Sequence, residues 1–100
     1  MIRHIVVWKL KEQAEGRPKS ENAILLKREL ESLVPKIKEI RRFEVGINFN
    51  TATDAYDLGL VSEFANKNDL NVYQNHPEHQ RVVGLLRRLR ESRIVVDYET

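Results

Sequence analysis

The sequence predicts an α+β fold whose elements follow one another in the order strand, helix, strand, strand, helix, strand. Apolar residues alternate with a period of two, or form short apolar runs, in four segments, and both patterns are typical of strands. Between the first and second segments, and between the third and fourth, apolar residues recur at three- and four-residue steps, as in amphipathic helices. Only a short turn separates the two middle segments, so we expect these strands to be antiparallel.

The first strand is expected at residues 2–10. One alternating set of its side chains consists of Ile2, His4, Val6, Trp8 and Leu10. The other set also has apolar residues at its centre, namely Ile5 and Val7. Since successive side chains of a strand point to opposite faces of a sheet, both faces of this strand need to be buried.

The first helix is expected after a polar loop at residues 11–19. Ser20 can cap a helix that begins at Glu21. Its amphipathic stripe is formed by Ala23, Leu26, Leu30, Leu33 and Ile37. Pro35 ends the regular helix near residues 33–34, because proline disfavours helical backbone in the residue before it.

The second and third strands are expected at residues 43–49 and 56–64, where apolar side chains alternate with polar ones or glycine. Residues 50–55 between them have the composition of a turn.

Two consecutive helical segments and a closing strand complete the chain. Asn66 is a typical N-cap for a short helix that runs through Tyr73. Pro77 interrupts this helix and suits the first position of a new one. The inward stripe of the new helix is formed by Val82, Leu86 and Leu89. We expect the last strand at residues 93–98, which carry apolar side chains on both faces.

Size and composition narrow the class of protein. The 100 residues leave room for one domain, expected to span residues 1–100, and 41% hydrophobic with 32% charged residues is typical of a globular chain. A net charge of +2 is too small to indicate nucleic-acid binding, and the absence of cysteine excludes disulfides and thiolate chemistry. No apolar stretch approaches the ~20 residues that span a bilayer, and the start lacks the features of a signal peptide. We therefore expect a cytoplasmic protein that binds neither nucleic acid nor a membrane.

Apolar side chains on both faces of the sheet predict a homodimer. Two helices cover only one face of a four-stranded sheet. The side chains that we assign to the uncovered face are Ile5, Val7, Val61 and Val95. Such a face is usually an interface, and two-fold pairing of two sheets buries it. The alternative is a monomer with scattered aliphatic side chains on its surface.

The segment from His76 to His79 has the composition of a candidate catalytic site. With His76 as the N-cap and Pro77 as the first helical residue, His79 falls in the first turn and faces the apolar stripe that contains Val82. A helix N-terminus and partial burial both disfavour the imidazolium, which leaves the neutral imidazole that a general base needs. Tyr73, three residues before His76, can donate a hydrogen bond to a carbonyl or enolate oxygen.

Further candidates lie on the first and last strands. Asp97 on the last strand can fix the tautomer of His4 on the first strand, if the two side chains meet. The expected ligand-binding residues are His4, His76, Asp97, Val6 and Trp8. We interpret Trp8 as a core residue rather than as a stacking platform.

Three interpretations of the histidines stay open at this point. Histidines beside a helix-initiating proline often only cap backbone groups, and a core tyrosine can have a satisfied hydroxyl. The second interpretation is a ligand-binding or catalytic pocket. The third is a metal site at His76 and His79 with His4 or Asp97, but this spacing is a weak signature, and we expect neither a metal nor a cofactor. Four arginines are interpreted as the solvated end of the last helix, namely Arg87, Arg88, Arg90 and Arg93.

Five segments of the chain follow the order of a known family's motifs. These segments are residues 2–10, 44–49, 56–58 together with 62–64, Tyr73 together with 76–79, and 95–98. Through them the chain resembles the stress-responsive A/B barrel domain family over nearly its whole length. The resemblance implies a ferredoxin-like fold, in which a four-stranded antiparallel sheet has its helices on one face and dimerises through the other into an α/β barrel.

The resemblance also implies roles for single residues. Most members of the family have no assigned activity, but its plant polyketide cyclases perform an aldol cyclisation with a tyrosine and a histidine as acid and base. Tyr73 and His79 stand at those two positions, and His4, His76 and Asp97 at positions that line the same pocket. The pocket-lining aromatic residues of those cyclases are not evident in the first helix, which instead contains Ile24, Leu25 and Leu26.

The expected function is therefore broader than cyclisation. We expect a homodimer with a small-molecule pocket between sheet and helices, and general acid/base chemistry of a cyclase or lyase type on a carbonyl compound. The alternative is a non-enzymatic stress-response or structural dimer whose histidines only cap and pack.

Overall fold

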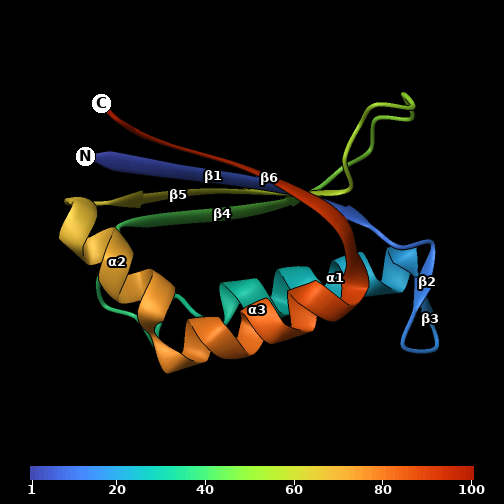
Figure 1. Ribbon diagram of the computed structural model, residues 1–100, viewed down its shortest axis with the longest axis horizontal. Helices are drawn as coiled ribbons and strands as arrows, with labels where there is room; N and C mark the ends of the chain where they lie inside the picture. The colour runs from blue at the N-terminus through green and yellow to red at the C-terminus, as the bar shows by residue number, and fades with distance from the viewer.

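The computed structural model describes residues 1–100 and contains a four-stranded antiparallel sheet with three helices on one face (Figure 1). In chain order the elements are β1 (Ile2–Leu10), β2 (Gln13–Ala14), β3 (Arg17–Pro18), α1 (Lys19–Glu31), β4 (Arg42–Ile47), β5 (Leu58–Phe64), α2 (Lys67–Asn75), α3 (Pro77–Leu89) and β6 (Arg90–Glu99). The strands of the large sheet lie in the order β4-β5-β1-β6, and all neighbours are antiparallel. The predicted α+β, ferredoxin-like fold is confirmed.

The start of α1 differs from the prediction. The expected loop contains a small hairpin of β2 and β3, whose turn uses left-handed backbone at Glu15 and Gly16. The chain leaves this hairpin through extended backbone at Pro18 and enters the helix at Lys19, so Ser20 lies inside α1 and does not cap it. The prediction of a Ser20 cap is wrong because the hairpin, rather than a side-chain cap, sets where the helix begins.

The break between α2 and α3 agrees with the prediction. The side chain of Asn66 accepts a hydrogen bond of 2.8 Å from the backbone N–H of Asp69 and so caps α2. His76 ends α2 and caps α3, because its Nδ1 accepts a hydrogen bond of 3.1 Å from the backbone N–H of Glu78. Pro77 occupies the first turn of α3, where its missing N–H leaves no helical hydrogen bond unmade.

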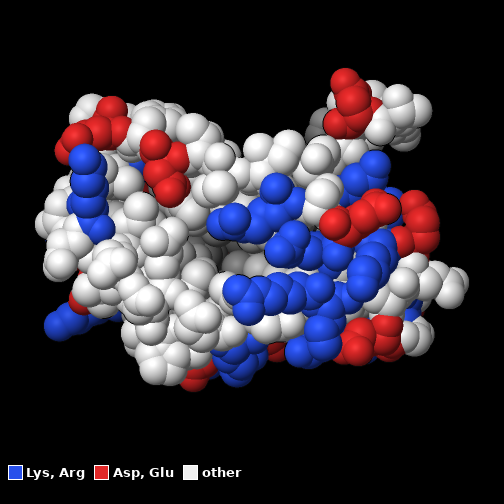
Figure 2. Space-filling view, viewed as in Figure 1, with Lys and Arg blue, Asp and Glu red and all other residues white.

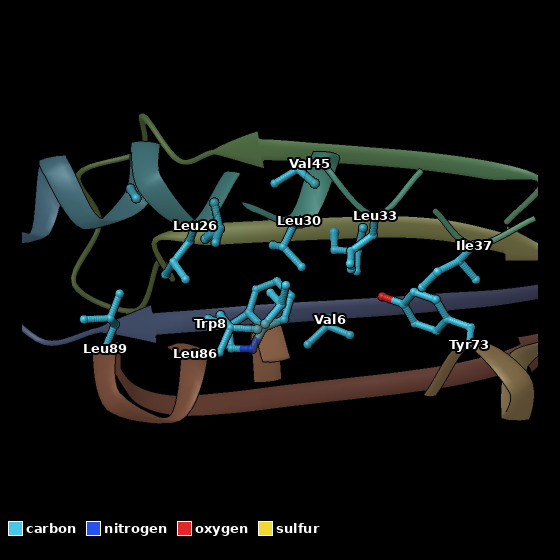
Figure 3. Packing of buried hydrophobic residues seen from close by; sticks show 14 of the residues in the cluster. Val6, Trp8, Leu26, Leu30, Leu33, Ile37, Val45, Tyr73, Leu86 and Leu89 are labelled. Atoms are coloured by element: carbon cyan, nitrogen blue, oxygen red, sulfur yellow. The ribbon is translucent and has the colours of Figure 1, made fainter. Parts of the chain in front are cut away.

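One hydrophobic core fills the space between the sheet and the helices. The buried set on β1 is the alternating one that begins at Ile2 and ends at Leu10, as predicted. Figure 3 shows Leu26, Leu30 and Leu33 facing Val6 and Trp8 across this space. The core therefore lies entirely on the helix-covered face.

The other face of the sheet is uncovered (Figure 1). Its centre is apolar, and beside this centre Arg3 and Arg42 form ion pairs with Glu63. Cross-strand pairing with Ile5 and Val7 places Val61, Val96 and Ile94 on this face. Val95 instead pairs with Val6, so its predicted place on the uncovered face is wrong. The reason is the register of β6 on β1, which the sequence of the last strand, apolar on both faces, does not specify. No helix of the structure is long and apolar enough to cross a membrane.

Candidate active site

A cavity of about 210 Å³ lies between the helix-covered face of the sheet and the helices. Figure 2 shows a hollow between the sheet and the helices on the side that faces the viewer, with Lys and Arg side chains gathered beside it. Five of the predicted site residues line the cavity, namely His4, Val6, Trp8, Tyr73 and His79. The structure thus brings together residues from β1, α2 and α3 that are up to 75 positions apart in the chain (79 − 4).

His79 is held with one ring nitrogen free. It is half-buried in the first turn of α3, and its Nδ1 lies 3.0 Å from the backbone carbonyl oxygen of Gln74. Because a carbonyl oxygen can only accept, Nδ1 carries the proton of this hydrogen bond. In a neutral imidazole, Nε2 is then an unprotonated acceptor, and it has no hydrogen-bond partner in the protein.

The surroundings of His79 favour this neutral form. Burial lowers the pKa of His79, and the nearby charge of Arg93 lowers it further, while the hydrogen bond to Gln74 acts in the opposite direction. The balance is a pKa below the ordinary value of 6.5. The side chain therefore suits the role of a general base near neutral pH.

Tyr73 is a buried side chain whose hydroxyl is free. Its ring centroid lies 4.3 Å from that of His79 and 6.2 Å from that of His4. The hydroxyl points from α2 toward Val6 (Figure 3) and makes no hydrogen bond within the protein. Burial raises the pKa of Tyr73 well above its ordinary value, so the hydroxyl stays protonated and can donate a hydrogen bond to a ligand in the cavity.

His4 is oriented from the neighbouring strand. His4 and Asp97 are cross-strand partners on β1 and β6, and Nδ1 of His4 is hydrogen-bonded to the Asp97 carboxylate. The ring of His4 is buried and lines the cavity, whereas Asp97 is exposed and does not line it. Asp97 thus fixes the ring of His4 from outside and leaves Nε2 as the nitrogen available to a ligand.

His76 has a different place from the one expected for a ligand-binding residue. It caps α3 and does not line the cavity. The capping interpretation therefore describes His76, whereas His4 and His79 face the cavity. No group of three or more His, Cys, Asp or Glu side chains lies close enough together to hold a metal ion.

Sequence reasoning missed three arginines that line the cavity, Arg87, Arg90 and Arg93. We interpreted them as part of a solvated helix end. Arg87 lies eight residues after His79, and this spacing places both on one face of α3, so a signal for it was present. Arg93 reaches the cavity only because β6 turns back along β1, where Arg93 is the cross-strand partner of Trp8.

Comparison with known proteins supports the fold and the family. The model of the Stress Responsive A/B Barrel Domain family matches residues 2–100. An uncharacterised protein of Streptomyces coelicolor is 32% identical over 100 residues, which cover 99% of each chain.

Two solved structures illustrate the range of similar proteins. A protein of unknown function from Bacteroides fragilis, described as dimeric and ferredoxin-like, is 37% identical with a TM-score of 0.82 over 99% of this chain and 95% of its own. Hydroxynitrile lyase from Passiflora edulis has a TM-score of 0.82 over 97% of this chain and 90% of its own. At 17% identity, the similarity to the lyase shows the fold alone.

Proposed function

The chain belongs to the stress-responsive A/B barrel domain family, and from this premise we propose that it is a homodimeric enzyme that performs general acid/base chemistry on a small carbonyl compound. The cavity between sheet and helices is the proposed active site. The cytoplasmic location expected from the sequence stays a prediction.

One observation carries this proposal: a free tyrosine hydroxyl and a free histidine nitrogen share one cavity. The hydroxyl of Tyr73 and Nε2 of His79 have no hydrogen-bond partner in the chain, and the centroids of their rings are 4.3 Å apart. Both residues line the cavity, where a ligand can reach these groups. A donor and an acceptor placed in this way suit a carbonyl compound that exchanges a proton.

The proposed chemistry moves one proton. Nε2 of His79 removes it from the carbon next to the carbonyl group, and the electron pair of the broken C–H bond forms an enolate. The enolate oxygen accepts a hydrogen bond from the hydroxyl of Tyr73, which stabilises the developing negative charge. The imidazolium then returns the proton to the ligand. His4, oriented by Asp97, lies on the same wall as a positioning group.

The alternative, a non-enzymatic dimer whose histidines cap and pack, is supported by His76. The hydrogen bond of His79 to the carbonyl oxygen of Gln74, in the last turn of α2, also fits this alternative. That bond uses only Nδ1, so the alternative does not account for Nε2, which has no partner in the protein. Nor does it account for the free hydroxyl of Tyr73.

The homodimer is supported by the uncovered sheet face and by the dimeric description of the protein from Bacteroides fragilis. Pairing through that face places the cavity on the opposite side of the sheet. Both cavities of such a dimer would stay open to ligand.

Hydrogen–deuterium exchange tests the proposed chemistry. Small ketones, both neutral and carboxylate-bearing, are incubated with the protein in D₂O, and deuterium incorporation next to the carbonyl is followed by NMR. We expect exchange with at least one ketone, slowed by roughly 10²–10⁴-fold in His79→Ala and also slowed in Tyr73→Phe.

The matched control is His76→Asn, outside the cavity, because asparagine can still cap a helix. It should exchange at the rate of the unchanged protein. Exchange that is absent with every ketone, or unaffected by His79→Ala, would show that this cavity is not a site of acid/base chemistry.

A further inference from the structure

We propose that the ligand of this cavity is a small organic anion whose carboxylate is bound by Arg87, Arg90 and Arg93. This inference deepens the proposed function, on which it rests, by naming the substrate class as a carboxylic acid that also carries a carbonyl group.

The three arginines are unusual for their lack of partners. All three line the cavity, yet none of them forms an ion pair or a side-chain hydrogen bond with the protein. Their neighbour Arg88, which does not line the cavity, is hydrogen-bonded to Glu15 at 3.1 Å. Three guanidinium groups around one opening repel each other, and an anion placed between them removes this repulsion.

No carboxylate of the protein competes for this position. The cavity lining contains neither aspartate nor glutamate. Asp97 is nearby on β6, but its carboxylate accepts the hydrogen bond from His4. A planar carboxylate that brings two acceptor oxygens matches the paired N–H groups of a guanidinium.

The remaining polar groups of the cavity also favour an acceptor-rich ligand. The hydroxyl of Tyr73 and the indole N–H of Trp8 are donors, and neither has a hydrogen-bond partner in the protein. Arg93, Tyr73 and His79 line the same cavity, and the charge of Arg93 lowers the pKa of His79. One ligand can therefore reach the arginines and the Tyr73–His79 pair together.

Exposure sets the orientation of the ligand. Arg87 and Arg93 are exposed and Arg90 is half-buried, whereas Tyr73 is fully buried. The carboxylate would therefore lie at the opening and the carbonyl group inside. A cavity of about 150 Å³ accepts a benzene ring, so about 210 Å³ fits one ring, or a chain of similar size, together with a carboxylate.

Benzoate and benzamide form a matched pair of probes, because they share a ring and differ in charge. We expect isothermal titration calorimetry to give a benzoate Kd at least ten-fold below that of benzamide. Arg90→Gln should weaken benzoate binding by ten-fold or more and leave benzamide binding unchanged. Arg88→Gln, two residues before Arg90 in the last turn of α3 but outside the cavity, should change neither Kd. Raising the salt concentration should weaken benzoate binding alone.

Several results would overturn the inference. They are an absence of benzoate binding, equal affinity for the two probes, and benzoate binding that is insensitive to Arg90→Gln. Inorganic phosphate that binds more tightly than benzoate would overturn the assignment to a carboxylate.

The inference and the proposed function can fail separately. Arginine-dependent benzoate binding without deuterium exchange in any ketone would retain the anion site and reject the acid/base chemistry. Exchange that is equally fast with neutral and carboxylate-bearing ketones, and unaffected by Arg90→Gln, would retain the acid/base chemistry and reject the anion site.

Discussion

At the scale of single residues, the state of His79 decides what the cavity can do. Two neighbouring features fix that state: burial beside Tyr73, and a backbone acceptor at Gln74 that holds the proton on Nδ1. A charged His79 would have no lone pair to accept a proton. Neutrality near pH 7 is therefore the property on which the proposed chemistry depends.

We predict that His79 titrates below 6.5, since burial and the charge of Arg93 lower its pKa. The unfolded chain has a His pKa of about 6.5. As pH falls below that value, the unfolded state binds a proton that the folded state does not, so the free energy of unfolding decreases. This contribution is complete above pH ~6.5 and is lost between that value and the lower folded pKa.

An NMR titration of the three histidines, with His79→Gln to assign the signal, measures the pKa directly. Urea unfolding at several pH values should show a steeper acid loss of stability in the unchanged protein than in His79→Gln. A His79 pKa of 7 or higher would contradict the neutral-base model.

At the scale of elements, local sequence patterns predicted those helices and strands whose bounds depend on residues close together in the chain. The alternation in β1 and the cap and proline at the α2–α3 break define those elements without help from the rest of the chain. The β2–β3 hairpin was missed because each of its strands has two residues, too few to show a period.

The residues of the candidate site also differ in whether local sequence or long-range strand pairing determines their place. Tyr73 and His79 were predictable because they lie on either side of one helix break. The place of Val95 and the contribution of Arg93 depend on how β6 pairs with β1, and a strand with apolar residues on both faces does not specify that register.

The helix break supplies a prediction at this scale. His76→Ala removes the acceptor for the backbone N–H of Glu78 and should destabilise the protein by about 0.5–2 kcal/mol. His76→Asn should recover most of that loss, since asparagine is a preferred N-cap. The free energies of unfolding in urea compare the three proteins. If His76→Ala were as stable as the unchanged protein, the cap would have no energetic role.

At the scale of the whole molecule, the uncovered sheet face needs a partner. Ile94 and Val96 are 54% and 52% exposed, and cross-strand pairing places them beside Ile5 and Val7. The loop between β4 and β5 projects beyond the sheet (Figure 1), and its Phe49 is 97% exposed. A cluster of exposed apolar side chains of this kind usually marks an interface. A two-fold axis would bury the same face on both copies.

We therefore predict that the protein is a dimer at micromolar concentration and that Val96→Asp dissociates it. Light scattering should give twice the monomer mass for the unchanged protein and the monomer mass for the variant. Each buried, unpaired carboxylate costs several kcal/mol, and the symmetry of a two-fold dimer introduces two of them. Because Val96 is half exposed in one copy, the charge should disturb the fold of a single chain far less than it disturbs the interface.

Val34→Asp is the matched control for this experiment. Val34 is 44% exposed, similar to Val96, but it follows α1, in the layer of helices that covers the other face of the sheet. The same charge placed there should leave the dimer intact. A monomer mass for the unchanged protein would contradict the dimer outright. Equal dissociation by both variants would show that Val96→Asp acts through general destabilisation, and the interface would then have to be assigned to another face.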